Sequence, residues 1–68
     1  MSAQVDVEVS NHGSIWLVTP ITEAAQEWIA EHVADDAQWF GFSLAVEHRF
    51  VTTLLEGIAD YGFEVLVH

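Results

Sequence analysis

The chain has 68 residues, with eleven Asp and Glu side chains against a single base, Arg49, and a formal net charge of −10. Hydrophobic residues make up 51% of it, which excludes intrinsic disorder, where high net charge accompanies low hydrophobicity. Nucleic acid and anionic lipid would both repel so negative a surface, so we expect no direct nucleic-acid binding and no membrane contact. The absence of cysteine excludes disulfides, a thiol nucleophile and a Cys-based zinc site.

We expect one small acidic domain over residues 1–68, with a well-filled core inside an acidic shell. The N-terminal residues alternate polar and apolar side chains and lack the basic and long apolar segments of a signal peptide. No run approaches the roughly 18 apolar residues of a membrane span. These features predict a cytoplasmic protein.

The first 19 residues predict a β-hairpin. Val5, Val7 and Val9 alternate with polar residues, which is the period of a half-buried strand. Asn11, His12 and Gly13 form a turn signal in which Gly13 can take a positive φ. Residues 14–19 follow as a second β-rich run.

The next segment predicts a helix over residues 20–33. Pro20 stands at the first helical position after Thr19 as a possible N-cap, and Thr22 is an alternative cap. His32 falls in the middle of the face that should bury against a sheet. The other members of that face are Ile21, Ala25, Trp28 and Ile29.

The second half predicts a loop over residues 34–41, a strand over 42–47, a helix over 48–61 and a last strand over 63–68. Gly57 is a weak spot on the polar side of that helix, and Gly62 is its expected C-cap. The order ββαβαβ predicts an α+β fold of two layers, a four-stranded sheet with two helices packed on one face. The order of the strands within the sheet stays open.

Carboxylates recur every four residues along the first helix, at Glu23, Glu27, Glu31 and Asp35, and Asp36 extends the row. The glutamates project opposite the buried face at steps of about 6 Å, close to the phosphate spacing of a nucleic-acid strand. None has a base three or four residues away, and like charges at that spacing destabilise a helix by about 0.2–0.5 kcal/mol per pair. A solvated helix face, a ladder imitating a phosphate backbone and a divalent-ion site all remain open.

A second acidic set occupies outward strand positions: Asp6, Glu8, Glu47 and Glu64. On the same outward phase we expect an apolar patch made of Trp16, Val18, Ala45 and Leu66. Such a patch rimmed by carboxylates is typical of an interaction surface. Alternatively, Trp16 tucks against a loop or the patch is a homodimer seam.

In the predicted loop, either one ring of Trp39 and Phe40 projects outward as an interface anchor, or both cap the first helix. No catalytic constellation stands out elsewhere. His32 and Asp36 are four residues apart, but two ligands do not make a metal site. We therefore expect no enzyme activity, no cofactor and no metal.

The stretch GSIWLVTPITEAAQEW, residues 13–28, resembles a segment of small bacterial proteins often encoded by phage and other mobile elements. In size, acidity and lack of chemical motifs, the whole chain also resembles anti-CRISPR proteins of the DNA-mimic kind. These proteins bind an effector complex and block its contact with target DNA. The resemblance implies a non-enzymatic inhibitor in the cytoplasm of a bacterial host, whose carboxylates meet the Lys and Arg side chains of a CRISPR effector subunit.

The main alternative is a small homodimeric adaptor that uses the apolar sheet face, with acidity serving only solubility. A mimic should bind its basic partner in a salt-sensitive way, whereas apolar dimerisation should be nearly indifferent to salt. Monomer and homodimer both remain open.

Overall fold

The computed structural model describes residues 4–33 and 37–68, and within them it has five strands and two helices in the order ββαββαβ. The α+β class with two helices is confirmed, but the prediction of four strands in the order ββαβαβ is wrong. The elements are β1 (Val7–His12), β2 (Ile15–Pro20), α1 (Glu23–His32), β3 (Gln38–Phe40), β4 (Ser43–Glu47), α2 (His48–Tyr61) and β5 (Val65–Val67).

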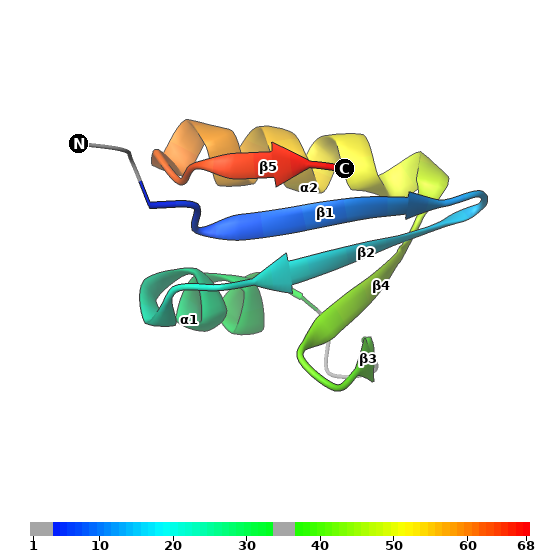
Figure 1. The fold of residues 1–68 in the computed structure, drawn as a ribbon, viewed down its shortest axis with the longest axis horizontal. Coiled ribbons are helices and arrows are strands. Elements are labelled where there is room, and N and C mark those ends of the chain that lie inside the picture. Colours follow the sequence, from blue (N-terminus) through cyan, green and yellow to red (C-terminus); the bar gives the residue numbers. More distant parts are fainter. Residues whose placement is uncertain (1–3, 34–36) are drawn as a thin grey trace.

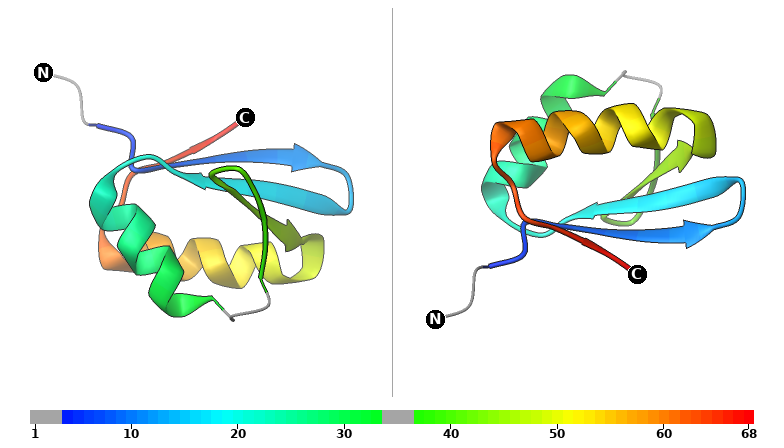
Figure 2. Two further views of the ribbon diagram at one scale, coloured as in Figure 1. Left: turned by 90° about the horizontal axis from the view of Figure 1, so that it is seen from below. Right: turned by 90° about the horizontal axis from the view of Figure 1, so that it is seen from above.

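The strands form one mixed sheet in the order β3-β4-β2-β1-β5 (Figure 1). The pair β1 and β5 is parallel, and the other neighbouring pairs are antiparallel. Both helices lie on the same side of this sheet (Figure 2). The sheet therefore has a helix side and, opposite it, an open face.

Two tight hairpins depend on glycine. Gly13 has φ +86° between β1 and β2, and its amide donates a 2.9 Å hydrogen bond to Asn11 Oδ1, as the turn signal predicted. Gly41 has φ +62° between β3 and β4, where Phe40 pairs with Ser43. A positive φ at the first of two turn residues suits the right-handed twist of the strands. The second hairpin was not predicted, because its first strand, β3, falls within the predicted loop over residues 34–41.

Helix α1 begins at Glu23, three residues later than predicted. Strand β2 continues through Pro20, which pairs with Val7 on β1. On its other side β2 pairs with β4 only as far as Val18, so no hydrogen bond between these strands is lost because Pro20 lacks an N–H group. Thr22, the alternative cap, is the N-cap, because its Oγ1 accepts a 3.3 Å hydrogen bond from the Ala25 amide. Ile21 precedes the helix and is 42% exposed, so its predicted burial is wrong.

The core lies between the sheet and the helices. Its fully or almost fully buried members are Val7, Val9, Val18, Ala25, Ile29, Leu44, Val51 and Ile58. Val18 pairs with Val9 on one side and Leu44 on the other, and all three side chains are buried. Neighbours in register share a face, so Val18 and, two residues before it, Trp16 lie on the helix side. Their predicted place on the open face is therefore wrong.

The second helix, His48–Tyr61, has the predicted bounds, and Gly62 is its C-cap with φ +107°. Gly57 marks a contact between helices instead of a weak spot on a polar side. A Cβ built there would lie 3.4 Å from Trp28 Cη2, so the absent side chain lets the indole lie close to α2. His32 is exposed, not part of the buried face, and its ring stacks on Trp28 at 3.9 Å.

Candidate functional site

Three glutamates form an exposed row along α1: Glu23, Glu27 and Glu31. Asp35 and Asp36, predicted to extend this row, lie outside the described residues. The ion pairs found in residues 4–33 and 37–68 join Arg49 to Glu47 at 3.5 Å and His68 to Glu8 at 3.0 Å. In that part of the chain, the acidic row consists of exposed carboxylates without a basic partner.

An open groove of about 430 Å³ runs beside the acidic row, between α1 and the end of α2. Its lining residues are Ala24, Glu27, Trp28, Ala30, Glu31 and Tyr61. The groove thus combines two carboxylates with two aromatic rings. Such a combination suits a cationic side chain, which an ionised carboxylate binds by charge-assisted hydrogen bonds and a ring attracts through its quadrupole.

Neighbouring aromatic side chains fix the positions of the Trp28 and Tyr61 rings. The Trp28 indole stacks on His32 with 13° between the planes, and His32 Nδ1 lies 2.7 Å from the Trp28 carbonyl oxygen. Tyr61 stacks on Phe63 at 4.8 Å, and the centroids of Trp28 and Tyr61 are 6.0 Å apart. The groove is therefore largely formed before any partner arrives.

Sequence reasoning missed this groove because it placed Trp28 on the buried face of the first helix. The sequence does hold one signal, the adjacency of Glu27 and Trp28 with Glu31 one turn later. That spacing brings two acids and an indole onto neighbouring parts of one helix surface. The contribution of Tyr61 depends on how the helices pack, which the local pattern does not contain.

Asp6, predicted as an outward contact residue, lies just before β1 and is half-buried. Its Oδ1 accepts a 2.8 Å hydrogen bond from Thr22 Oγ1, and its Oδ2 accepts a 2.9 Å bond from the Glu64 amide. Its backbone carbonyl also accepts a 2.6 Å bond from the Ile21 amide. Asp6 therefore ties the start of β1 to the entries of α1 and β5, and we assign it a structural role.

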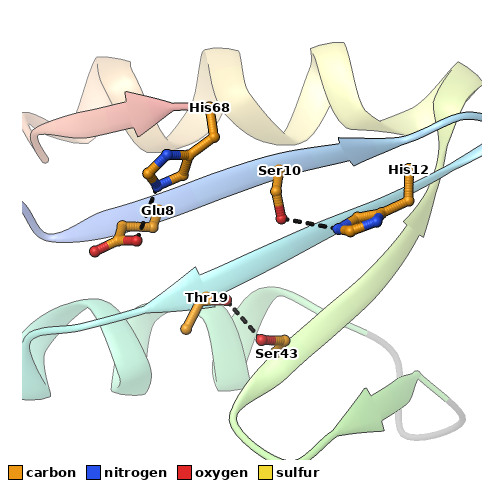
Figure 3. A network of polar contacts seen from close by, with 6 residues as sticks. All are labelled: Glu8, Ser10, His12, Thr19, Ser43 and His68. Carbon is orange, nitrogen blue, oxygen red and sulfur yellow. Dashed lines mark hydrogen bonds and ion pairs between the residues drawn. The ribbon is translucent and has the colours of Figure 1, made fainter.

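Of the other predicted strand acids, Glu8 lies on the interior strand β1, Glu47 ends β4, and Glu64 precedes β5. Glu8 bonds His68 on the open face (Figure 3), Glu47 pairs with Arg49, and the Glu64 side chain is exposed. Thr19, the register partner of Glu8 on β2, shares a 2.6 Å hydrogen bond with Ser43. Without Trp16 and Val18, the apolar side chains of this face are Ile15, Leu17, Ala45, Leu66 and, at the β3 edge, Phe40.

Trp16 makes its polar contact at the start of α2, where its Nε1 donates a 3.0 Å hydrogen bond to His48 Nδ1. Ser10 Oγ and His12 Nε2 lie 3.1 Å apart on the open face (Figure 3). This contact resembles part of a nucleophile–base pair. The nearby carboxylate of Glu8 bonds His68, however, and so the Ser10–His12 pair lacks that group as an orienter.

Trp39 and Phe40 lie in β3, at the edge of the sheet, instead of in a loop. Trp39 pairs with Leu44 and so lies on the helix side, while Phe40 pairs with Ser43 and lies on the open-face side. Both are exposed, Trp39 by 41% and Phe40 by 63%, and Phe42 in the following turn is 81% exposed. We call Trp39, Phe40 and Phe42 the aromatic corner.

No family model, curated protein or solved structure matches this chain. Within residues 4–33 and 37–68, no three His, Asp or Glu side chains gather closely enough to hold a metal ion. In the same part of the chain, neither helix has the length and apolar character needed to cross a membrane.

Proposed function

We propose that this chain is a non-enzymatic inhibitor that mimics DNA and occupies the nucleic-acid-binding surface of a basic protein. The observation that carries the proposal is the acidic row, three exposed carboxylates of α1 without a basic partner in the described residues. A chain folding only for stability gains by placing Lys or Arg among glutamates spaced four apart. Here the repulsion is retained.

The groove adds an anchor to this surface. An arginine of the partner that entered it would meet the Glu27 and Glu31 carboxylates beside the Trp28 and Tyr61 rings. Hydrogen bonds to charged groups contribute about 1.5–3 kcal/mol each, and an exposed cation–π contact adds about 0.5–1 kcal/mol. The expected target is a CRISPR effector subunit, the class implied by the resemblance to DNA-mimic anti-CRISPR proteins.

Plasmid interference in living cells tests this function. Cells with an active CRISPR system directed against a plasmid should accept that plasmid when they express this protein. The double variant Glu27→Lys/Glu31→Lys should lose the protection. The matched control is Glu56→Lys/Asp60→Lys, which reverses two exposed acids, also four residues apart, on α2. Each reversal changes the charge by two, so both doubles go from −10 to −6.

Loss of protection in the α1 double alone would assign inhibition to the acidic row. Equal behaviour of the two doubles would reject the row, because net charge would then explain the effect. Failure of the parent protein against a panel of CRISPR subtypes would reject this target class. Binding of a purified effector to duplex DNA, measured by gel shift with added inhibitor, then tests competition directly.

The alternative function, a homodimeric adaptor whose acidity serves solubility, would use the open face, where Ile15 and Leu66 are 37% and 43% exposed. Exposed apolar clusters mark protein contacts. Adaptor contacts of this kind should persist at high salt, whereas contacts of the acidic row should weaken as salt screens them. Elution of bound partners along a salt gradient separates the two functions.

A further inference from the structure

We propose that two copies of this chain associate edge to edge through β3 and the aromatic corner, independently of the inhibitor function. The first observation is exposure. Phe42, Phe40 and Trp39 are 81%, 63% and 41% exposed, and they gather around one strand and one two-residue turn. Aromatic side chains are enriched among the residues that anchor protein interfaces.

The second observation is the strand edge itself. β3 ends the strand order and pairs only with β4 among the described strands. The outer edge of such a strand offers backbone groups to another strand. Charged side chains or proline usually protect an edge, and β3 consists of Gln38, Trp39 and Phe40. The opposite edge, β5, adjoins Glu64, and its end bears the His68–Glu8 pair.

Charge identifies the occupant as a second copy. Residues 37–46 contain no charged side chain, although the whole chain carries −10. Two copies meeting through the acidic row would bring like charges together, at a cost in free energy. A basic partner would gain little at an uncharged corner. An uncharged contact lets a second, equally acidic copy approach without setting carboxylates against one another, and β3 offers such a contact.

The size of the corner indicates how stable this contact is. With roughly 200 Å² per aromatic side chain, the exposed fractions give on the order of 400 Å² of ring surface per copy. Stable interfaces bury about 800 Å² per partner. The contact is therefore a reversible, concentration-dependent dimer. Because salt screens the repulsion between two acidic copies, added salt should strengthen it.

Sedimentation velocity over a wide range of protein concentration tests this dimer. The parent chain should shift from monomer to dimer as concentration rises, and more readily at higher salt. Phe42→Asp should raise the dissociation constant by at least about tenfold, the loss of one anchor residue. Phe50→Asp is the matched control, because Phe50 is a 53% exposed aromatic residue on α2, outside the corner. Far-UV circular dichroism verifies that both variants fold.

A second measurement needs no variant. In ¹⁵N-labelled parent protein, the amide signals of residues 38–42 should shift with concentration, while those of β5 stay in place. A monomer at every concentration and salt level would overturn the proposal. So would equal dissociation of both variants, or concentration-dependent shifts on the open face, for example at Leu17 and Leu66, without shifts in β3.

Discussion

Asp6 shows how one side chain in an acidic protein can serve the fold instead of the surface. Its carboxylate accepts hydrogen bonds from Thr22 Oγ1 and from the Glu64 amide, which fixes the entries to α1 and β5. Removing a charged acceptor from such a pair leaves both donors to find water or remain unpaired. The residue is therefore important for stability although the whole molecule carries excess negative charge.

Asp6→Ala should lower the free energy of unfolding by about 1–3 kcal/mol, because the half-buried Thr22 hydroxyl and the exposed Glu64 amide lose their acceptor. Glu56→Ala removes the same charge from an exposed site on α2 and should change stability by less than about 0.5 kcal/mol. Urea denaturation of both variants measures the difference. Equal effects would show that net charge, not the hydrogen bonds of Asp6, controls stability.

Gly57 gives a second prediction at the residue scale, because its position beside Trp28 limits the side chain that fits. A Cβ at this position would lie 3.4 Å and 3.8 Å from two indole carbons, which is ordinary contact. Gly57→Ala should therefore stabilise the protein by about 0.5–1 kcal/mol, the usual gain of alanine over glycine within a helix.

A larger side chain at the same position should reverse the sign. Gly57→Leu would displace Trp28, which α1 uses to pack on α2 and which lines the groove. Overpacking of this kind costs about 1–3 kcal/mol. Thermal unfolding followed by tryptophan fluorescence measures both variants, and a destabilised alanine variant would contradict the presence of space for a methyl group beside the indole.

At the scale of the elements, α1 carries repulsion that a single substitution should relieve. Glu27 stands four residues from both Glu23 and Glu31, so Glu27→Lys converts two repulsive pairs into two attractive ones. At about 0.2–0.5 kcal/mol per pair in either direction, stability should rise by about 0.8–2 kcal/mol. Urea denaturation measures this rise, and Glu56→Lys on α2 is the control for net charge.

The same variant should inhibit less well. Stability and inhibition should therefore change in opposite directions, which separates a functional role of the row from a structural one. Functional surfaces commonly keep residues that reduce stability. A Glu27→Lys protein that is more stable but a weaker inhibitor would indicate that α1 retains its acids for binding. A variant that gains stability and still inhibits fully would mean that the row is only a solvated helix face.

Regular elements could be predicted from the sequence because their patterns are local. Helix α2 has a sustained apolar stripe and a C-terminal glycine, and the first hairpin has a turn signal at Gly13. Strand β3 was not predicted because its three residues are too few to show an alternating pattern. The signal that indicates it is Gly41, followed by Phe42, because glycine at the first of two turn residues is a hairpin signature.

The orientation of β2 was missed because apolar residues occupy both of its faces. Ile15 and Leu17 compete with Trp16 and Val18, and alternation alone cannot rank them. Hairpin register does so: the two-residue turn pairs His12 with Ile15 and therefore Val9 with Val18. The groove was missed for a different reason, since it joins two helices whose packing no local pattern contains.

At the scale of the whole molecule, a charge of −10 within a radius of gyration of 11.2 Å should make stability rise with salt. The screening length is about 30 Å at 0.01 M ionic strength and about 8 Å at 0.15 M. Over this range, the screening length falls from a value longer than the radius of gyration to one shorter than it. Repulsion across the molecule is therefore removed while contacts within the apolar core persist.

The expected outcome is a midpoint of thermal unfolding that rises between those two salt concentrations. The Glu56→Lys/Asp60→Lys double, with a charge of −6, should show a smaller rise because it has less repulsion to screen. Differential scanning calorimetry at low protein concentration measures both midpoints with the proposed dimer dissociated. Equal rises would mean that salt acts on something other than net charge. Added salt should weaken partner binding through the acidic row and strengthen dimer formation through the aromatic corner. The two affinities, measured over the same range of salt concentration, should therefore change in opposite directions.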